Sequence, residues 1–511
     1  MRLLKLPTRE PGRILIGLSL VSALFTAAEA PAGVSSQREI DTESGEVVHN
    51  PLLTQAGLEE RRGEEVIEEV DPTGEEPEEE EGMQPFLEPG LVFEGDVEVV
   101  INKLKNTTLG QEPDDNLRES EQEVNLGLSY APHERFFAFG EIKFVADQEV
   151  FDDGTPRFAE EVVERGETWL FFKQIYDSRF SLQLGRQSFF EPRLWWWDAD
   201  LDALRVYYDR GPWSLYMGLA EEIAPVSTQF GLIDPENDNA NRVLGHGRWQ
   251  GSERLNIDAF LLHQRDHSSR PPAGSAIKTE LEDESDADLT WAGLRASGDT
   301  GMSSWGALRY RLDGAFVTGN ETLFEFEEEG PDFSIVESQE EKRVRGWALD
   351  LGFNWAVPLP RSPSLTFIYA HGSGDKNHAD DTERAFHQTG LQDKDEEFRD
   401  YGQLLRPELS NLRIATIGAG FSVHRNARLW LGYHRFRQIY AAPFVRDASL
   451  DIEPTGKSRD IGQEISLVYE TWPRENLRFQ LIAASFEAGD AYGISAGERA
   501  SRLYFKVNFG F

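Results

Sequence analysis

The segments that connect candidate strands, here called joints, alternate between short and long along this 511-residue chain. From Leu91 onward, segments recur in which apolar and polar residues alternate, the period-two pattern of strands with one apolar face. Joints of at most six residues lie at Ala131–Glu134, Asp177–Arg179, Arg210–Pro212, Gly251–Glu253, Gly298–Ser303, Pro358–Pro363, His424–Asn426 and Trp472–Asn476. Polar joints of at least ten residues lie at Lys105–Arg118, Val150–Glu164, Glu191–Asp200, Ala224–Asn241, Asp266–Ala287, Thr318–Glu341, Gly374–Ser410, Ile439–Arg459 and Glu487–Ser501. Short and long joints alternate without exception.

Nine long and eight short joints predict eighteen strands, with both ends of the strand series on the short-turn side. A barrel inserted from one side of an outer membrane has an even number of antiparallel strands, short periplasmic turns and longer outer loops. A soluble β-sandwich has no reason to sort its loops by parity. We therefore expect an all-β fold, a transmembrane β-barrel of 18 antiparallel strands. Strand boundaries predicted from sequence are accurate only to within a few residues, so a barrel of 16 strands is the alternative.

The composition fits a barrel better than a soluble acidic protein. The formal net charge is −40 and the mean hydropathy is −0.49, yet aromatic residues make up 11% of the chain, including 12 tryptophans. Only alternate residues of a barrel strand meet lipid, so the mean hydropathy stays low while interfacial aromatic residues are plentiful. No segment beyond the N-terminal region approaches the roughly 18 apolar residues of a spanning helix. The chain has no cysteine, so disulfides cannot stabilise it.

The first ninety residues predict export and a periplasmic segment. Basic residues precede an apolar run, Ile14–Phe25, and small residues follow to Ala30, the pattern of a signal peptide at residues 1–30. Pro31–Gly90 carries 18 acidic residues and three arginines, so we expect an acidic disordered periplasmic arm there. The barrel domain then spans Leu91–Phe511. The arm could be a spacer, a docking segment for synthesis proteins, or a polyanion mimic that occupies the lumen.

The alternation also predicts which side chains face the lumen. Arg or Lys on the lipid face near mid-membrane costs about 2–4 kcal/mol, so the apolar face of each strand must point outward. In the last segment, Leu503, Phe505 and Phe511 point outward, which leaves Lys506 inside. The candidate pore-lining residues assigned in this way are Lys143, Arg205, Arg295, Arg309, Arg311, Asp313, Asp350, Glu464, Arg478 and Lys506. A barrel of about 16–18 strands is wide enough for an aqueous channel, so the lumen is predicted to be a hydrated pore lined with both signs of charge.

Six short motifs resemble the alginate-export outer-membrane porins of Gram-negative bacteria. They are "LGRQSFFEP" (Leu184–Pro192), "QTGLQ" (Gln388–Gln392), "PELSNL" (Pro407–Leu412), "GYHRF" (Gly432–Phe436), "RDIGQEISLV" (Arg459–Val468) and "GDAYG" (Gly489–Gly493). The resemblance covers Leu91–Phe511 and is densest after His371. It implies an 18-stranded barrel and passive export of a polyuronate through an electropositive constriction. Two features depart from the family pattern: the short turn Trp472–Asn476 and the acidic arm.

The resemblance adds four candidate pore-lining residues, Arg186, Arg399, Arg406 and Arg413. Two of them conflict with simple strand alternation. Leu182 and Leu184 face outward, so Arg186 reaches the lumen only if the backbone is irregular at Gly185 or the residue lies above the membrane. Arg413 has the same conflict of phase.

The leading functional hypothesis is an outer-membrane channel for passive export of an anionic exopolysaccharide such as alginate. Guanidinium groups pair bidentately with carboxylates, so an arginine-bearing lumen lowers the barrier for a polyuronate. The same residues could instead pair with lumen carboxylates and stiffen the barrel. An uptake porin for small organic acids or sugars is the alternative. A barrel-embedded enzyme would need a convergent serine–histidine motif, which the sequence lacks.

The expected partners are the polysaccharide, outer-membrane lipid and periplasmic polysaccharide-synthesis or secretion proteins, with no nucleic acid. No cofactor is expected. "DADLD" (Asp198–Asp202) resembles the start of a calcium loop, but Ala203 stands where glycine is required and the twelfth position is not glutamate, so we expect solvated loop carboxylates. The histidines near His387 match no metal spacing, and no metal is assigned.

Overall fold

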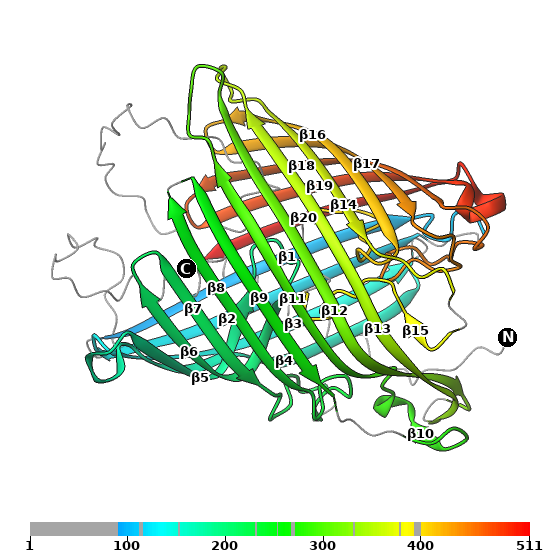
Figure 1. Ribbon diagram of the computed structural model, residues 1–511, viewed down its shortest axis with the longest axis horizontal. Coiled ribbons are helices and arrows are strands. Elements are labelled where there is room, and N and C mark those ends of the chain that lie inside the picture. The colour runs from blue at the N-terminus through cyan, green and yellow to red at the C-terminus, as the bar shows by residue number, and fades with distance from the viewer. Residues whose placement is uncertain are drawn as a thin grey trace.

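Eighteen antiparallel strands close into a barrel in the computed structural model (Figure 1), as the alternating joints predict. The structure describes residues 90–111, 116–151, 154–229, 232–252, 254–266, 271–330, 333–377, 380–392 and 400–511. Each barrel strand pairs with its neighbour along the chain, and the first and last strands pair through Asp96–Lys105 and Ser501–Gly510. A closed barrel leaves no free strand edge, which satisfies the backbone hydrogen bonds of a membrane-spanning sheet.

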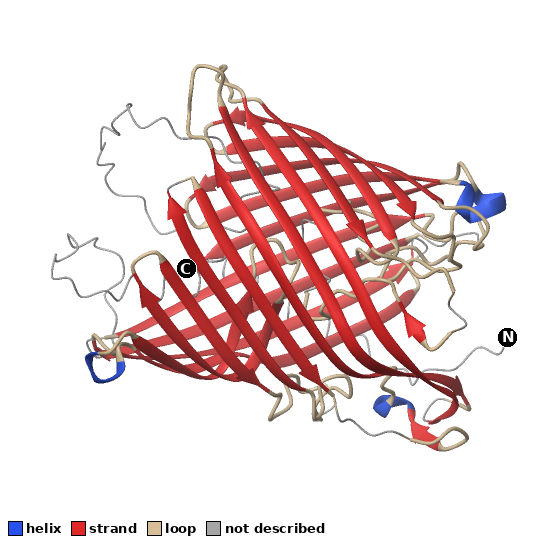
Figure 2. Cartoon of the chain, viewed as in Figure 1, coloured by secondary structure: helices blue, strands red, loops and turns tan. Residues whose placement is uncertain are grey.

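The barrel strands are β1 (Leu91–Lys105), β2 (Leu117–His133), β3 (Phe136–Phe151), β4 (Pro156–Phe172), β5 (Phe180–Phe190), β6 (Asp198–Arg210), β7 (Trp213–Ala220), β8 (Asn241–Ser252), β9 (Leu255–Arg265), β11 (Ser285–Asp299), β12 (Ala307–Glu328), β13 (Phe333–Ala356), β14 (Ser364–Gly372), β16 (Leu412–His424), β17 (Ala427–Gln438), β18 (Asp460–Arg474), β19 (Leu477–Ala488) and β20 (Arg499–Gly510). Two short strands, β10 (Ala276–Lys278) and β15 (Thr382–Glu383), add to β13 outside this closed series. The 3-10 helices η1 (Ile175–Asp177), η2 (Thr279–Leu281) and η3 (Asp490–Ser495) lie at the ends of the strands (Figure 2).

Two of the predicted long joints are wrong, because they are largely strand. β3 ends at Phe151 and β4 begins at Pro156, inside the predicted joint Val150–Glu164. β12 and β13 have 22 and 24 residues and fill most of the predicted joint Thr318–Glu341. These extensions carry acidic side chains on both faces, so they lack the apolar–polar alternation by which a strand is recognised in sequence and resemble a polar loop. In a paired hairpin, however, the backbone ladder continues outside the membrane as well as within it.

The outward and inward faces follow the side-chain alternation. In β12, Leu312 and Phe316 are exposed, whereas Arg311 and Asp313 are buried. In β13, Trp347 and Phe353 are exposed and Asp350 is buried. Because an aliphatic or aromatic outer face suits lipid, these exposed rows form the apolar band of the barrel.

The two N-terminal predictions, the signal peptide at residues 1–30 and the acidic arm at residues 31–90, lie outside the described residues apart from Gly90. Across the part of the chain that the structure describes, no helix is both long and apolar enough to cross a membrane.

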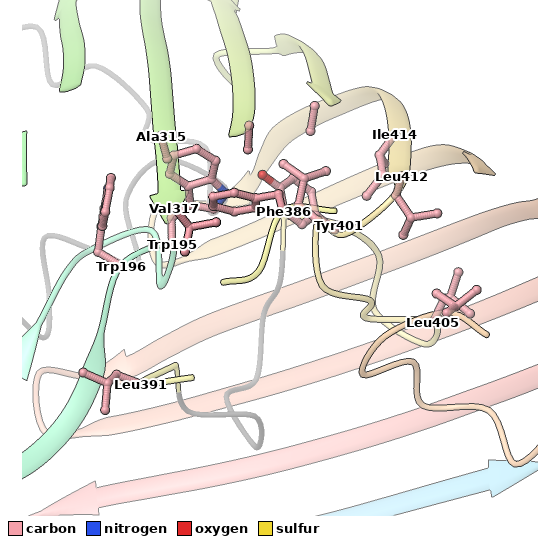
Figure 3. Close-up of a cluster of buried hydrophobic side chains, with 14 of the residues drawn as sticks. Trp195, Trp196, Ala315, Val317, Phe386, Leu391, Tyr401, Leu405, Leu412 and Ile414 are labelled. Carbon is pink, nitrogen blue, oxygen red and sulfur yellow. The ribbon is translucent and has the colours of Figure 1, made fainter. Parts of the chain in front are cut away.

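Inside the barrel, two connecting loops form a hydrophobic core with the strand walls (Figure 3). The loop between β5 and β6 supplies Trp195 and Trp196, and the loop between β14 and β16 supplies Phe386 and Tyr401. All four side chains are buried. The lumen is therefore partly filled by the chain itself, and the filling determines where a passage can run.

Candidate functional site

The loop between β5 and β6, residues 191–197, folds into the barrel and is held there by aromatic packing. Trp195 stacks on Phe386, with ring centroids 6.1 Å apart, and Trp196 stacks on Phe260 of β9, with centroids 4.8 Å apart. The carbonyl oxygen of Trp196 accepts a hydrogen bond from Thr389 of the β14–β16 loop. Buried tryptophans supply large apolar area and specific stacking geometry, so this loop is firmly placed.

Arg193 of this loop is the centre of an ion-pair network. Its Nη1 lies 2.7 Å from Asp313 Oδ2 of β12, and its Nη2 lies 3.1 Å from Asp350 Oδ2 of β13 and 2.9 Å from Asp400 Oδ2. The side chains of Asp313 and Asp350 are at most 1% exposed. Tyr401 donates a hydrogen bond to Asp350 Oδ2 at 2.8 Å. One loop cation thus joins two strands and a second loop.

Two further arginines complete this group, the central cluster of Arg193, Arg295, Arg311, Glu191, Asp313, Asp350 and Asp400. Arg295 of β11 contacts Glu191 and Asp313, and Arg311 Nη2 lies 2.6 Å from Asp400 Oδ2. Three arginines face four carboxylates here, so the formal charge of the cluster is −1. An electropositive constriction, which the family resemblance implied, is therefore not what these contacts form.

The β14–β16 loop is anchored to the opposite wall through Glu464 of β18. The Glu464 carboxylate accepts hydrogen bonds from three consecutive backbone amides, Gln403 at 2.5 Å, Leu404 at 3.2 Å and Leu405 at 3.0 Å. Arg502 of β20 donates to the Gln403 carbonyl oxygen at 2.7 Å. Successive backbone amides form a concave anion-binding site, so a wall carboxylate fixes the loop in place.

A cavity of about 1250 Å³, the vestibule, reaches from the short-turn end to the β5–β6 loop. Lys173, Arg179 and Phe511 line its mouth near the short turns, and Pro192 and Trp197 line its inner end. Eight acidic and seven basic residues line the vestibule, so its wall is close to neutral rather than arginine-rich. A smaller cavity of about 30 Å³ lies on the other side of Arg193. The β5–β6 loop separates the two spaces.

Most of the sequence-predicted residues lie on the inner face and are paired with carboxylates or backbone groups. Arg295, Arg311, Asp313 and Asp350 meet in the central cluster, whereas the others are dispersed. Lys143 Nζ lies 4.0 Å from Asp200, Arg478 Nη2 lies 3.0 Å from Glu470, and Lys506 Nζ lies 2.5 Å from Glu98. Arg309 stands opposite Asn354, which is 1% exposed, in the β12–β13 register. Their contact with a substrate stays a prediction.

Arg186 reaches the vestibule through the backbone irregularity that strand phase required. Gly185 has φ +118°, in the region that favours glycine, and a Cβ there would lie 2.2 Å from the Thr168 carbonyl oxygen. Gln183 before it and Arg186 after it both line the vestibule, so the inward phase switches across Gly185. Arg186 Nη1 lies 3.3 Å from Glu222.

Arg413 was wrongly predicted to line the pore. In β16, Leu412 and Ile414 are buried on the inner face, and Ile417 on the other face is 62% exposed. Arg413 shares the phase of Ile417 and therefore lies on the outer face. Arg406 is in the β14–β16 loop and lines the 30 Å³ cavity, and Arg399 lies outside the described residues.

Sequence reasoning missed Arg193, Asp400 and Tyr401, which are central to the network, because all three lie in segments predicted as solvated outer loops. One signal was present. The predicted loop Glu191–Asp200 contains Trp195–Trp197, and three consecutive tryptophans in a polar loop indicate burial.

Asp202 and His387, from the two sequence segments weighed for metal binding, each contact another side chain of the protein. Asp198, Asp200 and Asp202 belong to β6, not to a loop, so the expectation of solvated loop carboxylates was wrong. Asp202 pairs with Arg165 at 2.6 Å. His387 is buried, its Nδ1 lies 3.6 Å from Glu321 Oε2, and burial, followed by the nearby Arg446 charge, lowers its pKa well below the ordinary value.

Comparison with known proteins gives a family and a fold. A family model described as alginate export matches residues 98–506. The chain is 25% identical over 352 residues to the alginate production protein AlgE of Pseudomonas aeruginosa, covering 63% of this chain and 69% of that protein. It is 20% identical over 366 residues to AlgE of Pseudomonas syringae pv. tomato, covering 65% of this chain and 71% of that protein.

Solved structures agree on the architecture. Pseudomonas aeruginosa OpdQ superposes with a TM-score of 0.52 at 10% identity, covering 82% of this chain and 98% of that one. Acinetobacter baumannii OccAB2 gives 0.51 at 10% identity, with coverage of 82% and 98%. The outer membrane protein OprD of P. aeruginosa gives 0.50 at 10% identity, with coverage of 83% and 93%. At these identities the similarity shows the fold alone.

Proposed function

Because the chain belongs to the alginate export family, we propose that its lumen carries an anionic polysaccharide such as alginate from the periplasm to the exterior by passive diffusion. Family membership and the closed barrel make it a multi-pass outer-membrane channel rather than an enzyme.

The observation that carries the proposal is the position of Arg295 at the inner end of the vestibule, where Asp313 joins it to Arg193. Arg295 lines the cavity together with Pro192 and Trp197, where the cavity meets the β5–β6 loop, and Arg193 of that loop lines the smaller cavity beyond it. A polyuronate presents a carboxylate on each sugar, and each carboxylate can take the place of an aspartate on a guanidinium. Polymer that fills the vestibule would meet the central cluster at Arg295.

Exchange of partners also explains why a polymer would not become trapped. Every arginine in the central cluster already has a protein carboxylate, so a polymer carboxylate gains only the difference between two similar ion pairs. Conduction needs binding that is favourable enough to enter and weak enough to leave. The surplus of one carboxylate keeps that difference small. Propulsion would come from synthesis pressure or a concentration gradient.

The test is complementation of a strain that lacks the exporter but makes the polymer. Wild-type protein should restore polyuronate to the medium. The combined variant Arg193→Gln with Arg295→Gln should lower the released polymer several-fold at equal outer-membrane abundance. Liposome swelling with small organic acids provides the second measurement. Unchanged polymer release by the variant would contradict the role of these arginines. Failure of the wild-type protein to restore polymer, with small-acid flux that depends strongly on these arginines, would contradict export and favour an uptake porin.

A further inference from the structure

Arg205 of β6 differs from the paired lumen arginines described above. It is 8% exposed and lines the vestibule. Arg186, Arg193, Arg295, Arg311 and Arg478 each form an ion pair with a carboxylate. Among the described residues, no carboxylate forms an ion pair with Arg205. A buried charge without a counter-ion is costly, so its presence needs an explanation.

Neutral groups hold the Arg205 guanidinium. It donates from Nη1 to the Tyr207 hydroxyl at 2.9 Å and from Nη2 to the Ser188 carbonyl at 2.6 Å. Its Nε is buried and has no hydrogen-bond partner. Arginine has five N–H donors, so three remain beyond these two hydrogen bonds.

Aromatic rings surround the same group. The guanidinium carbon lies 3.5 Å from the ring centroid of Phe189, 4.9 Å from that of Tyr216 and 5.6 Å from that of Tyr207. The ring of Tyr216 in turn contacts that of Trp197, at the inner end of the vestibule, with ring centroids 6.4 Å apart. Cation–π contacts stabilise the charge and fix its plane, but they leave its in-plane donors available to an anion.

The nearby carboxylate of Glu167 is engaged elsewhere. It accepts hydrogen bonds from Trp169 Nε1 at 3.0 Å and from the Ser188 backbone amide at 3.1 Å. These donors hold the Glu167 carboxylate in its own position, so Arg205 keeps its donors for another acceptor.

We propose that Arg205 and the rings of Phe189, Tyr207 and Tyr216 form a subsite in the vestibule for one uronic acid residue of the polymer, reached before the central cluster. The uronate carboxylate takes the remaining Nη1 and Nη2 N–H donors of Arg205, and the aromatic wall contacts the C–H face of the pyranose ring. Sites of this kind combine apolar walls with a few placed polar groups. The subsite rests on the proposed export function and names the sugar chemistry that it recognises first.

The test uses the full-length protein in planar lipid bilayers, with short oligomannuronates and matched neutral mannose oligomers as blockers. Wild-type current should be blocked by oligomannuronate added on the short-turn side at lower concentration than by the mannose oligomer. Arg205→Gln should raise the half-blocking concentration of oligomannuronate about tenfold and leave that of the mannose oligomer unchanged, because a hydrogen bond to a charged group is lost. Tyr216→Leu should weaken block by both oligomers, because both present pyranose rings.

Arg499→Gln is the matched control. Arg499 is 69% exposed and pairs with Glu487 at 2.6 Å, away from the vestibule lining. Both oligomers should block the Arg499→Gln channel at the same concentrations as the wild-type channel. If Arg205→Gln does not assemble into a heat-modifiable barrel, Arg205→Lys takes its place, with a smaller rise expected because the charge is kept and the planar donors are lost.

The outcomes separate this subsite from the export function. Equal block of wild type and the Arg205 variants by oligomannuronate would overturn the subsite and leave export standing. Equal block of wild type by the charged and neutral oligomers would also overturn it. No block of wild type by oligomannuronate from either side would count against the export function itself.

Discussion

The two sides of the barrel interior differ in what covers the wall. The wall formed by β1 to β9 faces the open vestibule, whereas the wall that contains β13 and β18 is covered by the β14–β16 loop. On the covered side, Asp350 and Glu464 are 0% exposed and bind loop groups. On the open side, Arg205 retains unused donors. Inward charges thus secure the protein's own loop on one side and remain available to a solute on the other.

The largest effect is expected from releasing the covered side. Glu464→Leu removes the acceptor of three buried amides, and each unsatisfied buried group costs about 1–3 kcal/mol. The β14–β16 loop should detach from β18, and single-channel conductance should rise several-fold. Glu470→Leu is the control, because Glu470 accepts from Arg478 and Gln480 of β19 rather than from the loop. Equal conductance in the two variants would show that Glu464 does not hold the passage closed.

The boundary between the two sides depends on Arg193. Arg193→Gln leaves Asp313, Asp350 and Asp400 close together without their shared cation, and mutual repulsion should widen the gap at the β5–β6 loop. We expect a smaller conductance increase than for Glu464→Leu, together with a shift of reversal potential toward cation selectivity. Arg193→Lys should retain most of the wild-type selectivity. Unchanged reversal potentials in a salt gradient would place the current path elsewhere.

The shape of the open side depends on Gly185. Gly185→Ala places a Cβ 2.2 Å from the Thr168 carbonyl oxygen at φ +118°, a conformation that costs a non-glycine residue about 1–3 kcal/mol. The free energy of unfolding in detergent should fall by that amount. Gly140→Ala in β3 is the matched control, since its Cβ meets no atom within 4 Å. Equal stability of both variants would mean that Gly185 is not needed to turn Arg186 inward.

The smallest effect is expected on the outer face. Arg413→Gln changes a side chain that shares the phase of the exposed Ile417, so polymer release and oligomannuronate block should match wild type. Reduced polymer export at equal outer-membrane abundance would indicate that Arg413 faces the lumen after all.

The fold could be predicted because joint length and side-chain period are local properties of the chain. The alternation around Arg311 and Asp313 predicted both on the inner face, and both are buried; the phase conflict at Arg186 required an irregularity at Gly185, which has a φ of +118°. The central cluster could be predicted only in part, because Arg193 and Asp400 come from loops that fold inward, and no period encodes that fold. The pairing of lumen charges also depends on contacts between distant segments.

The length of β12 and β13 has a consequence at the cell surface. At roughly 3.4 Å per residue, the 24 residues of β13 are about three times as long as the ~25 Å apolar band, and at a strand tilt of about 45° their height is still about twice that of the band. The β12–β13 hairpin therefore extends beyond the bilayer. Gly330, near its end, has open space around its Cβ position. An antibody or bacteriophage that approaches an intact cell would meet this hairpin early, so an epitope inserted there would report surface display of the protein.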